Sequence, residues 1–190
     1  GYLIKEYFAN YSLYMSDITF HMDEDNRMEV HQKRGEPWKV TLVDTGDLTE
    51  TAGRLKRVMP FIQDDSFCFT YGDGLANINI AKLIDFHKKK NTLTTLTAVK
   101  PPGRFGALKI QDSKVVQFTE KPDGDLAWIN GGFFVVQKEV VNLIDGDDSS
   151  WENDVLPLIA SQGELASFYH YDFWQPMDTL RDRTKLQELW

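Results

Sequence analysis

The chain has 190 residues of globular composition, with 29 acidic against 21 basic side chains and a formal net charge of −8. This acidic balance argues against a general nucleic-acid binder, and the lack of any run of about 18 apolar residues argues against a membrane-spanning helix. Cys68 is the single cysteine, so an internal disulfide and a cysteine-based zinc site are excluded, and a reducing, cytoplasmic setting is expected.

The first part of the chain predicts a helix followed by an exposed hairpin. Four apolar residues recur at helical spacing: Leu3, Ile4, Tyr7 and Phe8. Lys5 and Glu6 interrupt this stretch, which therefore lacks the long apolar core of a secretory signal. Residues 17–22 alternate as a strand does, and we expect them to pair with residues 28–34.

Strands then alternate with helices. Residues 38–46 predict a β-branched strand, and residues 51–62 predict an amphipathic helix. Residues 66–74 are too apolar for a surface strand, so we expect a buried strand that ends at Gly-Asp-Gly. A helix over 78–91 and a strand over 92–99 follow. This order predicts βαβ crossovers and an α/β fold with a mixed, mainly parallel sheet that carries helices on both faces.

The second half predicts an α+β continuation. The expected elements are a hairpin of residues 106–110 and 114–122, a strand over 128–136, a helix over 137–144, a helix from Ser149 or Ser150 to Gly163, a strand over 165–174 and a closing helix capped by Thr179. No change of composition marks a linker and no repeat is present, so we interpret residues 1–190 as a single domain.

Two aspartates follow predicted strands and predict a metal site. Asp73 lies between glycines that let a ligand approach the backbone, and a carboxylate there suits a hard cation beside phosphates. Asp178 also lies between a strand and a helix. A tight turn is the alternative for Asp73, and helix capping is the alternative for Asp178. Because both can meet at one sheet edge, we favour a shared Mg²⁺.

Two further segments carry candidate anion and sugar ligands. In FTEKP, Lys121 can supply positive charge to a phosphate and Glu120 can accept hydroxyl hydrogen bonds, although a solvated turn is the alternative. Thr51, Gly53 and Arg54 begin a predicted helix, where free N–H groups and the helix dipole attract anions. A basic surface helix is the alternative there.

Seven segments, in this order, resemble the glucose-1-phosphate cytidylyltransferases, a branch of the sugar-nucleotide transferase superfamily: EPWKVTLVDTG, TAGRLKR, FTYGDG, PPGRFGALKI, FTEKP, INGGFFV and FWQPMDTLRDR. Glu-Lys-Pro and a strand-end aspartate identify only the superfamily, whereas PPGRFGAL, INGGFF and WQPMDTLRD look specific to the cytidylyl branch. The glycine-rich G-G-x-G-T-R loop and downstream Pro-Lys with which the family opens have no match among these residues. We therefore expect an N-terminally incomplete nucleotidyltransferase fold.

The resemblance implies transfer of CMP from CTP to α-D-glucose 1-phosphate, giving CDP-glucose and pyrophosphate, with Mg²⁺ on a Rossmann-like fold. It also implies a homo-oligomer whose product serves bacterial surface polysaccharide, with neither nucleic acid nor membrane as a partner. The residues that match the family's catalytic and metal positions are Asp73, Asp178 and Lys121. Those that match its sugar-pocket and nucleotide positions are Gly106, Glu120, Asn130, Thr51, Gly53 and Arg54.

Three alternatives stay open at this point. The base preference rests on the resemblance alone, so a nucleotidyltransferase for another nucleoside triphosphate is one. A metal-dependent glycosyltransferase would prefer an Asp-x-Asp pair, but Asp73 is followed by Gly74 and Leu75. The third is a non-catalytic fragment that binds sugar nucleotides or oligomerises, which the unmatched phosphate loop favours.

Overall fold

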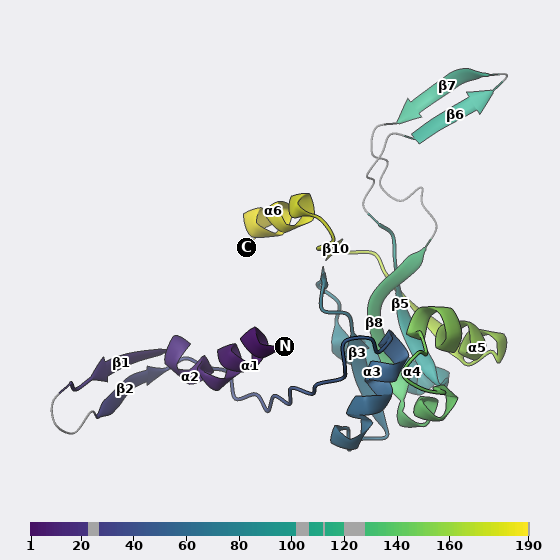
Figure 1. Cartoon of the computed structure of the whole chain (residues 1–190). Helices are drawn as coiled ribbons and strands as arrows, with labels where there is room; N and C mark the ends of the chain where they lie inside the picture. Colours follow the sequence, from purple (N-terminus) through teal and green to yellow (C-terminus); the bar gives the residue numbers. More distant parts are fainter. Residues whose placement is uncertain (23–26, 102–106, 112, 120–127, 190) are drawn as a thin grey trace. The chain divides into compact units, whose positions relative to one another are not determined.

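The computed structural model describes residues 1–22, 27–101, 107–111, 113–119 and 128–189 (Figure 1). The chain divides into two compact units, Gly1–Asp47 and Leu48–Trp190. Each unit is described by itself below.

The first unit is a helical segment followed by a hairpin. Helices α1 (Tyr2–Ala9) and α2 (Tyr11–Tyr14) precede strand β1 (Ser16–Phe20), which pairs antiparallel with β2 (Met28–Lys33). The helix and the hairpin predicted from the apolar spacing are therefore confirmed.

The strand predicted over residues 38–46 is wrong. This segment has no regular secondary structure, and none of the described residues pairs with it. A β-branched run becomes a strand only when a neighbouring strand accepts its backbone hydrogen bonds. Instead the side chains of Trp38, Val40 and Leu42 are exposed, and Trp38 stacks on Tyr11 with 5.7 Å between ring centroids.

The second unit is built on a four-stranded mixed sheet. Its order is β3 (Ser66–Thr70), β8 (Ile129–Gln137), β5 (Thr94–Val99) and β9 (Leu165–His170). Strand β8 is antiparallel to β3 and β5, whereas β5 and β9 are parallel, so three of the four strands share one direction. The predicted α/β class is confirmed, but the expectation of a buried strand before Gly-Asp-Gly is wrong, because β3 lies at the edge and Cys68 is exposed.

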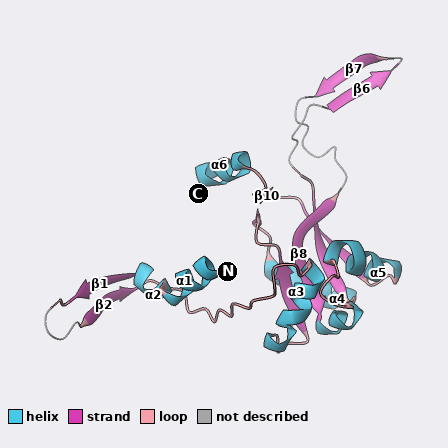
Figure 2. Cartoon of the chain, viewed as in Figure 1, coloured by secondary structure: helices cyan, strands magenta, loops and turns pink. Residues whose placement is uncertain are grey.

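Helices cover both faces of this sheet (Figure 2). On one face, Phe134 and Val136 of β8 join a core with α3 (Thr51–Val58), its 3-10 continuation (Met59–Phe61) and α5 (Leu156–Ser161). On the other face, Val135 packs with Leu83 of α4 (Ile80–Lys90). Successive side chains of a strand point to opposite faces of the sheet, so alternate β8 residues pack into the two opposite cores.

The ends of the helices follow local capping chemistry. Asn79 Oδ1 accepts the Lys82 N–H at the start of α4, and Asn91 ends that helix in the left-handed conformation. Ser150 Oγ accepts the Asn153 N–H, which confirms Ser150 as the predicted cap. That helix begins as a π-helical turn (Trp151–Val155) before continuing as α5.

One remaining helix differs in type from the prediction, and the second hairpin is present. The helix predicted over 137–144 is a 3-10 helix, Lys138–Leu143. The hairpin beyond Pro101 is confirmed as β6 (Ala107–Gln111) paired antiparallel with β7 (Lys114–Thr119).

A buried histidine joins α4 to two strands. His87 is 1% exposed, and its Nε2 accepts a 2.9 Å hydrogen bond from Gln137 Nε2. Its Nδ1 lies 2.9 Å from Thr95 Oγ1, so the neutral tautomer that fits carries its proton on Nδ1. Burial lowers the pKa of His87 below its ordinary value.

We predict an acid-dependent loss of stability at this histidine. Because the folded-state pKa of His87 is lowered, the unfolded chain binds more protons, and the free energy of unfolding falls as the pH falls through about 6.5. His87→Asn keeps a donor near the Nδ1 position but does not titrate. Between about pH 7 and about pH 5, its free energy of unfolding, measured by urea titration, should therefore fall less than that of the wild type. An equal slope in His87→Asn and the wild type would contradict the prediction.

Candidate functional site

A short strand pair brings the two predicted metal-binding aspartates into the same neighbourhood. Strand β4 (Gly74–Ala76) pairs antiparallel with β10 (Trp174–Pro176), and Pro176 lies opposite Gly74. Just beyond this pair, the Met177 N–H donates to the Asp73 carbonyl over 2.8 Å. Asp178 therefore directly follows Met177, whose backbone is bonded to Asp73.

A capping box fixes the chain directly after Asp178. Thr179 Oγ1 accepts the Asp182 N–H at the start of α6 (Leu180–Leu189), while Asp182 Oδ2 accepts the Thr179 N–H over 3.1 Å. Asp182 is buried and also accepts from Gln175 Nε2 on β10. The capping function considered as an alternative for Asp178 is thus performed by Thr179, as predicted for the closing helix.

The donor chemistry at this place fits a hard divalent cation. Asp73 and Asp178 offer carboxylate oxygens, which Mg²⁺ prefers, and Mg²⁺ usually takes one or two carboxylates together with substrate phosphates. Within the described part of the chain, no group of three or more His, Cys, Asp or Glu side chains could hold an ion. An ion between these two aspartates would therefore need further oxygen ligands, which a bound phosphate can provide.

A polar network that the sequence reasoning missed lies beside Asp73. Tyr71 Oη donates to Glu152 Oε1 over 2.5 Å, and Thr51 Oγ1 donates to Glu152 Oε2 over 2.7 Å. Asn130 Nδ2 in turn donates to Tyr71 Oη over 3.3 Å. Two predicted substrate-binding residues, Thr51 and Asn130, are thus joined through Glu152 and Tyr71.

The charges of this network follow from its hydrogen bonds. Burial raises the pKa of the Glu152 carboxyl, but hydrogen bonds from Tyr71, Thr51 and Ser150 outweigh it, so its pKa lies below the ordinary value. Burial, and then the hydrogen bond and charge of Glu152, raise the pKa of Tyr71 far above its ordinary range, with a smaller contribution from Asp73. Glu152 is therefore ionised and Tyr71 neutral. The sequence signal for Glu152 was only that of an acidic residue in a first helical turn.

The expectation of free N–H groups where α3 begins is wrong. The amides of Ala52 and Gly53 both donate to the Ser149 carbonyl, over 3.1 and 3.2 Å. Thr51 Oγ1 accepts the Trp151 N–H over 2.8 Å, so this hydroxyl serves the chain's own backbone. A nucleotide contact by Thr51, Gly53 and Arg54 stays a prediction, without the helix-terminus argument that motivated it.

Arg54 lines a mainly apolar cavity of about 370 Å³ along the edge strand β3. Thr51 and Tyr71 join Arg54 in its lining, and the remaining lining residues are Leu55, Val58, Ile62, Phe67, Cys68 and Phe69. The polar network and the cavity therefore share two residues, Thr51 and Tyr71.

A glycine lets the Tyr71 ring reach the backbone of β8, and Trp174 binds the carbonyl of the residue before it. Gly132 has φ +77°, and a Cβ there would lie 2.7 Å from the Tyr71 ring. Asn130 Oδ1 accepts the Gly132 N–H over 2.9 Å, and Trp174 Nε1 donates to the Gly131 carbonyl over 2.8 Å. The INGG segment is thus held by Tyr71, which follows β3, and by Trp174 of β10.

Three predicted site residues, Gly106, Glu120 and Lys121, lie outside the described residues. Their placement in the sugar pocket stays a prediction.

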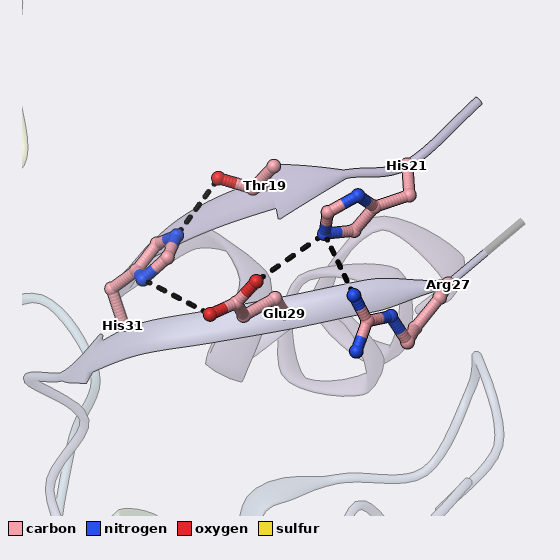
Figure 3. Close-up of polar contacts among 5 residues, drawn as sticks. All are labelled: Thr19, His21, Arg27, Glu29 and His31. Atoms are coloured by element: carbon pink, nitrogen blue, oxygen red, sulfur yellow. Dashed lines mark hydrogen bonds and ion pairs between the residues drawn. The ribbon is translucent and has the colours of Figure 1, made fainter. Parts of the chain in front are cut away.

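A second polar cluster lies on the β1–β2 hairpin of the first unit (Figure 3). The Glu29 carboxylate lies 3.3 Å from His21 Nε2 and 3.8 Å from His31 Nδ1, and Thr19 bonds the other nitrogen of His31. Glu29 and His31 are about half exposed, and exposed pairs of this kind contribute little stability. We assign no ligand to this cluster.

The sequence comparisons decide the family. The nucleotidyl transferase model matches residues 6–182. This chain belongs to the nucleotidyl transferase family. Glucose-1-phosphate cytidylyltransferase of Salmonella typhi is 62% identical over 191 residues, which span this whole chain and 74% of that protein. The probable glucose-1-phosphate cytidylyltransferase of Bacillus subtilis is 37% identical over 193 residues, again 74% of its length.

Solved structures confirm the fold of this nucleotidyl transferase. HddC from Yersinia pseudotuberculosis superposes with a TM-score of 0.57 at 22% identity, over 75% of this chain and 63% of that chain. A putative glucose-1-phosphate thymidylyltransferase from Bacillus anthracis gives a TM-score of 0.56 at 18% identity, over 76% of this chain and 62% of that chain. At these identities the likeness concerns the fold alone. Among the described residues, no helix has both the length and the apolar character that crossing a bilayer requires.

We predict that Gly53 is required for close packing. A Cβ at this position would lie 2.5 Å from the Asp147 carbonyl oxygen, which cannot retreat easily because it accepts the Glu50 N–H. Gly53→Ala should therefore lower the free energy of unfolding by about 1–3 kcal/mol in urea titrations. Gly146→Ala is the matched control, since a Cβ there meets nothing within 4 Å, and it should change stability by less than about 0.5 kcal/mol. Equal stability of the two variants would refute the packing argument.

Proposed function

We propose that this chain transfers CMP from CTP to glucose 1-phosphate, giving CDP-glucose and pyrophosphate. The proposal is supported by the 62% identity to a glucose-1-phosphate cytidylyltransferase across the full chain. The observation that carries the chemistry is the 2.8 Å bond from Met177 N to the Asp73 carbonyl, which brings Asp73 and Asp178 to neighbouring positions.

The proposed reaction is a single in-line displacement. A phosphate oxygen of glucose 1-phosphate attacks the α-phosphorus of CTP, a new P–O bond forms, and the bond to the β-phosphate oxygen breaks as pyrophosphate leaves. The attacking oxygen is already ionised near neutral pH, so a general base is unnecessary. Positioning and charge neutralisation then supply the rate enhancement.

Each predicted residue has a part in this proposal. Asp73 and Asp178 hold the cation, and Lys121 orients the attacking phosphate. Mg²⁺ bound there would supply charge neutralisation at the α-phosphate. Glu120, Gly106 and Asn130 receive the sugar, while Thr51, Gly53 and Arg54 contact the nucleotide. As part of the proposal, residues 1–190 act as one domain of a cytoplasmic homo-oligomer that supplies bacterial surface polysaccharide.

The substrate assignment is tested by pyrophosphate release. We expect the purified chain to release pyrophosphate with CTP and glucose 1-phosphate, and to do so faster than with GTP, UTP or dTTP at equal concentration. Calorimetry with CTP, glucose 1-phosphate and CDP-glucose accompanies the assay. Binding without turnover would favour the non-catalytic fragment, and a preference for another triphosphate would overturn the cytidylyl assignment.

We predict that Asp178→Asn lowers the rate of pyrophosphate release by about 100-fold or more, because the amide is a weak ligand for a divalent cation. The capping box of Thr179 and Asp182 is untouched, so the melting temperature should stay within a few degrees of wild type. Asp148→Asn makes the same charge change at an exposed position and should leave the rate unchanged. A normal rate in Asp178→Asn would show that the metal assignment is wrong.

A further inference from the structure

Three segments far apart in the sequence meet at the Tyr71 hydroxyl. Glu152 comes from the π-helical turn, Tyr71 follows β3, and Asn130 lies on β8. The hydroxyl lies 2.5 Å from Glu152 Oε1 and 3.3 Å from Asn130 Nδ2. A phenol has a single proton to donate, so the direction of one of these bonds dictates the direction of the other.

The carboxylate sets that direction. An ionised carboxylate accepts hydrogen bonds only, so the Tyr71 proton points to Glu152, and the phenol oxygen must accept from Asn130. The Asn130 amide is turned with Nδ2 toward Tyr71 and Oδ1 toward the Gly132 N–H, 2.9 Å away, and both partners require this orientation because the Gly132 N–H can only donate. The orientation of an asparagine amide is decided by such a network.

The fold holds both Glu152 and the Tyr71 ring in place. The second oxygen of Glu152 accepts from Thr51 and Ser150, over 2.7 and 3.2 Å. The Tyr71 ring packs edge-on against Phe134, with 5.6 Å between centroids, and against the backbone of Gly132. The charge and the ring are therefore both held by the fold before any substrate arrives.

We propose that Glu152 is a positioning residue which, through the Tyr71 hydroxyl and together with the Gly132 N–H, fixes the amide of Asn130 for a sugar hydroxyl of the hexose phosphate. By its hydrogen-bonding capacity, Asn130 keeps one Nδ2 hydrogen and one Oδ1 lone pair beyond the two bonds described. The fixed amide thus offers a donor and an acceptor in known places. This inference rests on the proposed function, because that function is what places a sugar at Asn130.

Two conservative variants test the relay. Tyr71→Phe removes the hydroxyl but keeps the ring. Glu152→Gln keeps the shape of the side chain, but an amide can donate as well as accept, so residue 152 no longer dictates the direction of the Tyr71 proton. We expect each to raise the KM for glucose 1-phosphate about tenfold while kcat changes less than about twofold. Tyr71→Phe should leave the KM for CTP unchanged. The double variant should be no worse than Tyr71→Phe, because both act through one hydroxyl.

A matched control separates positioning from general stability. Ser150→Ala removes another Glu152 contact and a helix cap, which should lower the melting temperature by a few degrees, but it leaves the path from Glu152 to Asn130 intact. Its KM for glucose 1-phosphate should equal that of the wild type. A KM that follows stability across all the variants would overturn the proposal.

A second readout does not depend on turnover. The side-chain amide signals of Asn130, assigned by their loss in Asn130→Asp, should shift in Tyr71→Phe and in Glu152→Gln but not in Ser150→Ala. If the wild type releases no pyrophosphate, the proposed function fails, and these signals together with calorimetry of glucose 1-phosphate still decide the relay. Unmoved signals, or unchanged binding of glucose 1-phosphate in both variants, would overturn it.

Discussion

The pairing of β4 with β10 is the constraint on which the arrangement around Asp73 depends. Each strand has three residues, which is too short to be stable alone. Hydrogen bonds at both ends extend the pair: Asn77 N donates to the Phe173 carbonyl over 3.2 Å, and Met177 N donates to the Asp73 carbonyl over 2.8 Å. The capping box of α6, whose Asp182 is buried, then holds β10 through Asp182 and Gln175. The position of Asp178 is thus set by backbone bonds on one side and a helix start on the other.

Charge is distributed so that two basic residues of α3 serve the fold. Lys56 Nζ donates to the Ile144 carbonyl over 2.6 Å, and Arg57 pairs with Asp147, whose pKa the hydrogen bond from Arg57 lowers. In a chain of net charge −8, an anionic substrate needs positive charge from a local source. Because Lys56 and Arg57 are engaged with residues 144–147, that charge must come from a cation or from other residues. The proposed cation between Asp73 and Asp178 would be one such source.

The sequence predicted what local chemistry decides. Helical spacing, Ser150 and Thr179 as caps, and the paired hairpins all depend on residues within one or two turns, and these features are present in the structure. The strand over 38–46 failed because β-structure depends on a partner elsewhere in the chain. Glu152 and Tyr71 were missed for the same reason, since 81 positions separate two residues whose side chains touch. Asp73 and Asp178 were predicted as metal ligands because both follow predicted strands and match the family's motifs, and that assignment stays a prediction.

The two halves of strand β8 differ: one half packs into the apolar cores, and the other carries polar groups and glycines. From Phe133 to Val136 its side chains enter the two cores, where burial alone fixes them. From Asn130 to Gly132 it has an amide and two glycines. Hydrogen bonds with Tyr71, with Trp174 and from the Gly132 N–H to the Asn130 side chain fix that part. The register between β5 and β8 shifts between Leu96 and Ala98, where one half gives way to the other. A strand interrupted in this way can present polar groups at one end without weakening the apolar packing at the other. The irregular half therefore carries the polar groups to which the proposed function assigns contact with the sugar.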